Sequence, residues 1–338
     1  RSLTDGPGED EVMHIRGNPA APSKAPAKRH FLDAFAPEPF TVWGSGRKQW
    51  TDAALGAGMP LTARVEVNRI WYRLFGRGLV ESVDNFGVKG SLPSHPELLD
   101  RLAEEFVDSG WSRKKLIRQL VLSSTYRMST HASAKSFDVD PANVLLQHAN
   151  VRRLPAEAIR DAVLATSGSL NDQMYGPGVP LHLGQMPPSR ARPLKSGPLD
   201  GNRRRAIYQE MRRNYLPPLL LAFDLPQAAV ALGKRGVTNV PAQSLALLND
   251  PFIIQQADRW ADQIMHTENL STEERVDLLH RIALSRPATE KEIDLARHML
   301  NYFGEDASVK ETSGSKSKKA WQNLCHLMFN RKEFIFIR

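Results

Sequence analysis

Apolar residues recur at helical spacing from Leu61 to Phe75, and a second stripe follows between Ser94 and Gly110. The period of about 3.6 residues predicts an amphipathic helix in both places. Gly76 and Gly110 stand where these helices should end, since glycine readily adopts the left-handed conformation that closes a helix. Ser94 and Glu97 predict a capping box at the start of the second helix.

Three more helices are predicted before residue 170. Ser112 is the expected cap of one, which buries Leu116 and Leu120. Asp140-Pro141 predicts a short helix through Leu146, because proline is tolerated at the first helical position. The third runs from about Pro155 to Thr166 and ends before Gly168.

The helical pattern stops between Gly176 and Asn202, where glycine and proline are frequent. A long surface loop is predicted there, and loops of this length are often functional. The following segment, Arg205 to Met211, is compatible with a short strand or a helical turn, and the strand is favoured.

Helical signals return in the last third of the chain. Pro251 marks a helix start, and two capping boxes are predicted at Ser271 with Glu274 and at Thr289 with Glu292. The Ser/Lys/Gly-rich stretch 306–319 is expected to be a mobile connector before a last helix.

These elements predict a mainly α fold: an irregular multi-helix domain with a few short strands and long Gly/Pro-rich loops. Residues 1–30 are expected to contain one strand-like stretch, Val12 to Ile15, followed by an extended linker. Residues 31–305 form the predicted main domain, with a basic loop at 176–203. Residues 306–338 are the connector and a helix that packs on the main domain.

Composition narrows the class of protein. The chain has 338 residues, 41% of them apolar, and can bury a sizeable core. No run of eighteen apolar residues exists, so no membrane span is expected. Cys325 is the only cysteine, which excludes an internal disulfide and disfavours a thiolate zinc site. Arg1 is not an initiator methionine, so we expect the sequence to be part of a larger protein.

Most of the net charge of +8 lies between Met186 and Tyr215, where cations greatly outnumber Asp200 and Glu210. An anionic polymer is one explanation, and ion pairs within the fold or plain solvent exposure are the other. No nucleic-acid fingerprint accompanies the block, and a sulfated or carboxylated polysaccharide satisfies the same electrostatics. The candidate binding residues are Arg190, Arg192, Lys195, Arg203, Arg204, Arg205, Arg212 and Arg213.

Polar residues also gather at predicted helix ends and turns. A functional interpretation brings His95, Glu157, Asp161, Asp224 and Arg235 into one pocket, where two carboxylates divide acid and base work. The alternative is that such residues cap helices and form buried ion pairs, a task for which the planar arginine fork is suited. The structural candidates are Asn68, Arg69, Trp71, Asp84, Arg152, Arg153, Arg235, Thr238, Gln243, Asn249 and Asp250.

Familiar catalytic and cofactor motifs are missing from the sequence, including the nucleophile elbow, the Walker loop and the Rossmann glycine run. No transition-metal site and no cofactor are expected in this chain. Without C-x-x-C-H it cannot attach a c-type haem itself.

Several short sequence motifs, separated along the chain and in a fixed order, resemble those of domain-of-unknown-function family 1553 of planctomycete-type exported proteins. They include Val83-Asp84-Asn85-Phe86-Gly87, Arg152-Arg153-Leu154, Ile159-Arg160-Asp161, Leu247-Leu248-Asn249-Asp250-Pro251, Ser285-Arg286-Pro287 and Glu333-Phe334. The resemblance implies a periplasmic or cell-surface location and other domains of the same protein as partners, among them a cytochrome c domain in which any haem would lie. It also implies an association with carbohydrate breakdown, and it suggests that residues 1–30 are the tail of a preceding β-rich segment plus a linker.

The leading interpretation is a non-catalytic structural or interaction module of a large exported protein that binds an anionic polysaccharide. The alternative is a glycan-directed hydrolase that uses His95, Glu157, Asp161 and Asp224.

Overall fold

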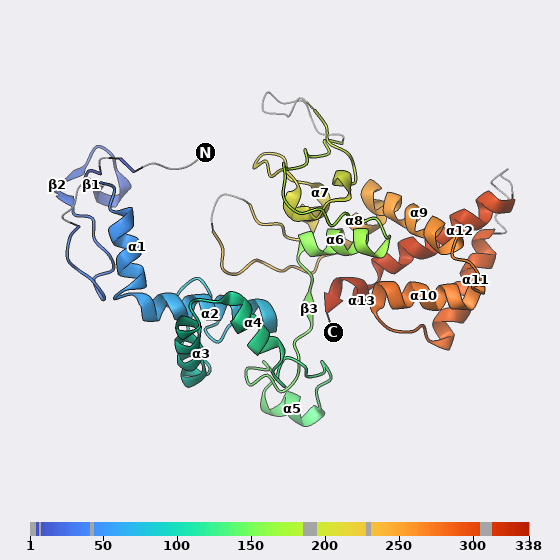
Figure 1. Ribbon diagram of the computed structural model, residues 1–338, viewed down its shortest axis with the longest axis horizontal. Coiled ribbons are helices and arrows are strands. Elements are labelled where there is room, and N and C mark those ends of the chain that lie inside the picture. The colour runs from blue at the N-terminus through green and yellow to red at the C-terminus, as the bar shows by residue number, and fades with distance from the viewer. Residues whose placement is uncertain are drawn as a thin grey trace. The chain divides into compact units, whose positions relative to one another are not determined.

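The fold is mainly α, as predicted. A computed structural model describes residues 5–6, 8–40, 44–184, 195–227, 231–304 and 313–337. Within these ranges, α-helices dominate and the only sheets are two antiparallel pairs of short strands (Figure 1). The chain divides into two compact units, residues 1–150 and 151–338. This division falls inside residues 31–305, which the sequence alone treated as one domain.

The first unit opens with a hairpin of β1 (Glu11–His14) and β2 (Pro22–Ala27), joined by a 3-10 turn, η1 (Ile15–Gly17). The strand-like residues thus agree with β1, and the expected linker supplies β2. Helix α1 (Arg47–Leu55) was not predicted, because it buries only Ala54 and carries no apolar stripe.

Three helices build the core of the first unit: α2 (Met59–Phe75), α3 (Pro96–Asp108) and α4 (Arg113–Val121). Helix α2 packs against both others. Gly76 closes α2 with a φ of 81°, and Ser112 caps α4, as predicted. The capping box at Ser94 is wrong, because Pro96 takes the first helical position and makes His95 the cap.

The rest of the first unit is held by turns. Helix α5 (Ala134–Val139) ends where the sequence predicted a helix to begin. The segment from Asp140 to Leu146 is not helical, since Asn143 and Leu146 have positive φ. The Asp140 carboxylate accepts hydrogen bonds from the N–H groups of Val144 and Leu145 and holds this turn.

The second unit begins and ends in the same two-stranded sheet. Strand β3 (Arg152–Arg153) pairs with β4 (Phe336–Ile337), so the chain's last strand meets the strand that precedes α6 (Ala156–Thr166). Helices α7 (Pro218–Ala222) and α9 (Pro251–Met265) both contact α6. Trp260, fully buried on α9, lies at the centre of this core with Phe329 beside it.

The remaining helices pack with α9 around α12 (Ser313–Asn330), which contacts each of them. They are α8 (Pro241–Asn249), α10 (Thr272–Leu284), α11 (Glu290–Gly304) and α13 (Lys332–Ile335). Helix α12 packs along α9 and α11 (Figure 1). Pro251 begins α9, and both predicted capping boxes are present. Residues 306–312 of the predicted connector lie outside the described residues, and the chain is already helical from Ser313.

Between α6 and α7 the described chain is largely irregular. It contains two 3-10 turns, η2 (Gly201–Arg203) and η3 (Ala206–Tyr208). The favoured strand at Arg205–Met211 is therefore wrong and the helical turn is correct. The Asp161 carboxylate accepts a hydrogen bond from Ala206 N–H at 2.7 Å, which satisfies the start of η3 without a strand partner.

None of the helices in the described ranges combines the length and apolar character that crossing a bilayer requires.

Candidate functional site

Asn68 holds the turn that follows α2. Its side chain is fully buried and bonds both backbone groups of Val80, from Nδ2 to the carbonyl and from the amide N–H to Oδ1, each at 2.9 Å. Gly78 lies against it, and a Cβ there would come within 2.4 Å of the Val80 carbonyl oxygen. Asn68 therefore acts as a backbone clamp.

The other first-unit candidates contact their own neighbours. Trp71 stacks on Phe75 with ring centroids 4.1 Å apart. Arg69 and Asp84 form a half-exposed ion pair at 3.4 Å. His95 Nδ1 lies 2.9 Å from the Ser94 hydroxyl oxygen.

In the second unit, Arg153 and Asp224 form a nearly buried pair. The Arg153 side chain is 2% exposed, and its Nη2 donates to Asp224 Oδ2 at 2.7 Å and to the Phe223 carbonyl at 3.1 Å. Its Nη1 donates to the carbonyl of Thr238 at 2.7 Å. The guanidinium thus ties together strand β3, the end of α7 and the segment before α8.

Thr238 and Gln243 complete this network. The Thr238 N–H and hydroxyl both donate to the Asp224 carboxylate at 2.8 Å, and Gln243 Nε2 donates to the Thr238 carbonyl at 3.1 Å. Burial opposes ionisation of Asp224, but these donors and Arg153 outweigh it and lower its pKa. Asp224 is therefore a fixed carboxylate acceptor and is poorly suited to act as a general acid.

A second network joins α6 to the irregular segment. Arg160 is 3% exposed, and its guanidinium donates to the carbonyls of Arg204 at 2.9 Å and Asp200 at 2.8 Å. Gly201 must be glycine here, because a Cβ would lie 2.6 Å from Arg160 Nη2 and φ is +61°. Asp200 is fixed in turn by Arg259 at 2.9 Å.

Asp161 differs electrostatically from Asp224. Burial raises the pKa of Asp161, and the Ala206 N–H and the charge of Arg160 only partly offset it. Burial also lowers the pKa of the Arg160 guanidinium. The pKa values of Asp161 and Asp224 are thus shifted in opposite directions.

Arg204 is the centre of the same segment, although the sequence placed it among the exposed binding residues. It is 6% exposed and donates to the carbonyls of Pro177 at 3.0 Å, Gln173 at 3.2 Å and Tyr175. Its guanidinium carbon lies 3.9 Å from the ring centroid of Tyr208. Arg204 therefore links residues 173–177 to the segment that contains Arg204 itself.

The remaining basic candidates divide into three groups. Arg190 and Arg192 lie outside the described residues. Arg205 is half-buried, and Arg212 pairs with Glu210 at 2.8 Å. Lys195, Arg203 and Arg213 are exposed, and their side chains make no ion pair or hydrogen bond with any described residue.

The other predicted polar residues lie at helix starts and ends. Glu157, in the first turn of α6, receives both of its hydrogen bonds from Arg235, at 2.8 and 2.9 Å. Asp250 caps α9 through Phe252 N–H, and burial raises the pKa of its carboxyl. Asn249 bonds the Leu245 carbonyl, and Arg152 is half-buried in β3.

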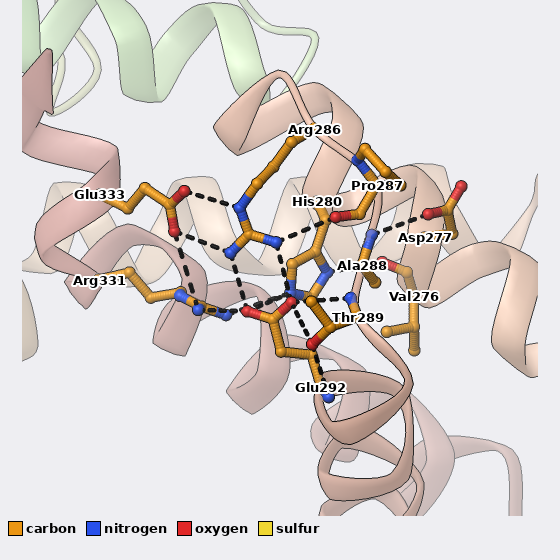
Figure 2. Close-up of polar contacts among 10 residues, drawn as sticks. All are labelled: Val276, Asp277, His280, Arg286, Pro287, Ala288, Thr289, Glu292, Arg331 and Glu333. Carbon is orange, nitrogen blue, oxygen red and sulfur yellow. Dashed lines mark hydrogen bonds and ion pairs between the residues drawn. The ribbon is translucent and has the colours of Figure 1, made fainter. Parts of the chain in front are cut away.

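The candidate residues predicted from the sequence did not include an ion-pair cluster around Arg286. Figure 2 shows its guanidinium between two carboxylates, with bonds of 2.7 and 2.8 Å to Glu333 and 2.9 Å twice to Glu292. Arg331 also donates to Glu292. The hydrogen bonds from Arg286 lower the pKa of Glu292 far below its ordinary value, despite burial.

His280 completes the Arg286 cluster in a neutral form. Its Nδ1 lies 2.9 Å from the Val276 carbonyl oxygen and must donate to it. Its Nε2 lies 3.1 Å from Arg331 Nη1 and must accept. The motifs Ser285-Arg286-Pro287 and Glu333-Phe334 were recognised in the sequence, but nothing in their spacing indicated that Arg286 and Glu333 form an ion pair.

The catalytic candidates are not gathered by any described contact. Glu157, Asp161 and Asp224 each bond a different arginine, and His95 belongs to the first unit. Within the described residues, no three histidine, cysteine or acidic side chains are grouped so that they could hold a metal ion.

Comparison with known proteins assigns the chain to a family. A family model described as "PSD1: Protein of unknown function (DUF1553)" matches residues 46–300, about three quarters of the sequence. The chain belongs to the PSD1 family. The match includes the Arg153 and Arg160 networks of this PSD1 chain and stops before Arg331 and Glu333. No curated protein and no solved structure matches it.

Proposed function

We propose that this PSD1 chain is a non-catalytic interaction module whose second unit binds an anionic polysaccharide. The proposal is carried by a contrast among its arginines. Arg153, Arg160 and Arg204 are buried and bonded to carbonyls or carboxylates, whereas Arg203 and Arg213 are exposed without a described partner. The buried arginines hold the fold, and the exposed ones are available to a ligand.

The charge of the segment supports an anionic ligand. Residues 195–213 contain six lysines and arginines against Asp200 and Glu210. Asp200 is already paired with Arg259 and Glu210 with Arg212, so neither neutralises Arg203 or Arg213. A polymer that repeats its negative charges can contact several of these cations at once, with an affinity that decreases as salt is added.

A polysaccharide is preferred over other polyanions because of the location that the family resemblance implies. We propose that the protein acts outside the cytoplasm, where acidic polysaccharides are common polymers. The networks around Asp224, Asp161 and Arg286 then serve to keep the irregular loop in place and to hold the helices around it.

The test is a salt-dependent binding measurement with polygalacturonate and dextran sulfate, with neutral dextran as the uncharged control. The wild-type chain should bind both acidic polymers and not dextran. The double variant Arg203→Glu/Arg213→Glu should lose most of this affinity while its melting temperature stays within about 2 °C of wild type.

The matched control is Lys114→Glu/Lys115→Glu, which changes the net charge equally at two exposed positions of α4. This variant should bind almost as well as wild type. Equal loss in both variants would show that only net charge matters, and absence of binding by the wild type would contradict the proposed function.

A glycan-directed hydrolase is the second candidate, and the raised pKa of Asp161 favours it. A carboxyl whose pKa is raised by burial is more easily protonated than an ordinary aspartate, and this suits a general acid. The test is release of reducing ends from polygalacturonate, comparing wild type with Asp161→Asn, which keeps the shape and an acceptor oxygen. Activity that the variant abolishes would support this candidate, and the absence of activity in the wild type would exclude it for this substrate.

A further inference from the structure

Tyr175 is displayed on the surface in an unusual backbone conformation. Its side chain is 76% exposed, and its φ is +63°. The left-handed region disfavours residues with a Cβ by about 1–2 kcal/mol, so a tyrosine remains there only where its surroundings enforce it. An exposed aromatic ring held in this way needs a reason beyond packing.

Two neighbours enforce the conformation of Tyr175. Its N–H donates to the hydroxyl oxygen of Tyr208 at 2.9 Å, and its carbonyl accepts from Arg204 Nη2. Arg204 also bonds the carbonyls of Gln173 and Pro177, on either side of Tyr175 in the sequence. The turn that carries the Tyr175 ring is therefore held by hydrogen bonds from one buried arginine, Arg204.

The segment that pairs with the one carrying Tyr175 is rich in arginine. Residues 171–179 run beside residues 204–209, with bridges at Asn171–Arg204 and Val179–Gln209. Arg203 is exposed, and its carbonyl accepts from Asn171 N–H at 2.9 Å. Arg205 lies 5.9 Å from the Tyr208 ring centroid, and its buried Nε has no hydrogen-bond partner in the described structure. The exposed ring of Tyr175 is thus carried by a segment that pairs with one bearing the exposed Arg203 and the half-buried Arg205.

This inference rests on the proposed function and adds to it the way in which the ligand is recognised. We propose that Tyr175 stacks against a pyranose ring of an acidic polysaccharide while Arg203 and Arg205 bind the carboxylate or sulfate groups. The C–H groups on one face of a sugar ring are complementary to the negative face of an aromatic ring. A ring beside arginines therefore recognises a sugar that carries an acidic group.

The arrangement favours a sugar chain over single-stranded nucleic acid. Nucleic-acid surfaces use several aromatic side chains on which successive bases stack. Here the second ring, that of Tyr208, is already covered by Arg204 at 3.9 Å and hydrogen-bonded through its hydroxyl to Tyr175. In the paired segments 171–179 and 204–209, only Tyr175 offers an open aromatic face.

The experiment compares two polyanions that each carry one negative charge per repeating unit, polygalacturonate and inorganic polyphosphate, which lacks sugar rings. Tyr175→Ala should weaken polygalacturonate binding about tenfold, since one aromatic contact contributes up to about 1.5 kcal/mol. Tyr175→Phe should bind within about twofold of wild type because the stacking face remains. Polyphosphate binding should be the same in all three proteins.

Met174→Ala is the matched control, because Met174 is 54% exposed and adjacent but offers no ring. This variant should leave both affinities unchanged, and melting temperatures should show that every variant folds.

The outcomes separate this inference from the proposed function. If Arg203→Glu/Arg213→Glu weakens binding but Tyr175→Ala does not, the proposed function stands and the stacking role is overturned. An equal loss of polyphosphate binding in Tyr175→Ala would also overturn it, as would binding to single-stranded RNA with the same dependence on Tyr175. If the wild type binds neither polyanion, the proposed function fails.

Discussion

The second unit uses arginine in two contrasting ways. In the cluster of Figure 2, Arg286 and Arg331 meet Glu292 and Glu333, so cations and carboxylates are equal in number. At the irregular segment, Arg160 of α6 and Arg204 bond mainly to backbone carbonyls through their guanidinium groups. Carbonyls satisfy hydrogen bonds but carry no net charge, so this segment keeps its positive charge.

This difference underlies the proposal that one unit holds its helix ends with ion pairs and binds anions at the irregular segment. A carboxylate partner neutralises a cation and fixes helix ends, as Glu292 does at the start of α11. A carbonyl partner fixes an irregular loop but does not neutralise the arginine, so the positive potential of the segment remains available to an anion in solvent. The contrast predicts that the two regions respond differently to mutation and pH.

The largest effect is expected for Arg286→Met, which leaves Glu292 and Glu333 without their shared partner. We expect a loss of about 3 kcal/mol in the free energy of unfolding at pH 7. The folded-state pKa of Glu292 is lowered, so the stability that it contributes is present above its unfolded pKa of about 4.3 and is lost as pH falls below that value. Urea unfolding should therefore show the variant approaching wild type below about pH 4.

A cost that stays constant between pH 7 and pH 3.5 would contradict the assignment of that stability to the carboxylates.

The same substitution in the other region, Arg204→Met, should cost about 2 kcal/mol because three carbonyls lose a donor. Carbonyls do not titrate, so urea unfolding should give the same difference from wild type at pH 7 and pH 4. The neighbouring Arg203→Met is the matched control and should stay within about 0.5 kcal/mol of wild type, because Arg203 is exposed. Equal costs at the two positions would break the distinction between buried and exposed arginines.

The smallest effect is expected for Asp161→Asn, at less than about 1 kcal/mol. The folded-state pKa of Asp161 is raised, so any stability that it contributes is present below its unfolded pKa of about 3.9 and is lost as pH rises through the folded value. The variant should therefore gain on wild type as pH rises from about 3.5 to 7, the opposite of Arg286→Met. Thermal melts across this range measure the difference in stability. A variant that loses stability relative to wild type as pH rises would contradict the raised pKa of Asp161.

Local signals in the sequence predicted much of the fold. Gly76 ending α2, Pro251 beginning α9 and the capping box of Thr289 with Glu292 depend on neighbours within a few residues. Where prediction failed, a distant residue decided the structure. The turn at Ala206 depends on Asp161, which is 45 positions away in the sequence.

The networks were less accessible to sequence analysis for the same reason. The polar sequence motifs were recognised in the sequence. Two interpretations of them were considered, a catalytic pocket and a structural role in ion pairs and helix caps. Their partners could not be named, because Arg153 meets Thr238 and Arg286 meets Glu333 only through the packing of helices between them. Arg204 was assigned to the surface because it stands in a run of three arginines, which says nothing about which side chain turns inward.

The central claim is that the polar motif residues hold the structure while the exposed loop cations bind the ligand. The most direct measurement is hydrogen–deuterium exchange of the wild-type chain with and without polygalacturonate. The account predicts added protection in residues 171–176 and 203–213 and no change around Asp224, Thr238 and Gln243 or in the Arg286 cluster. Protection concentrated at those networks, with none at Arg203 to Arg213, would contradict it.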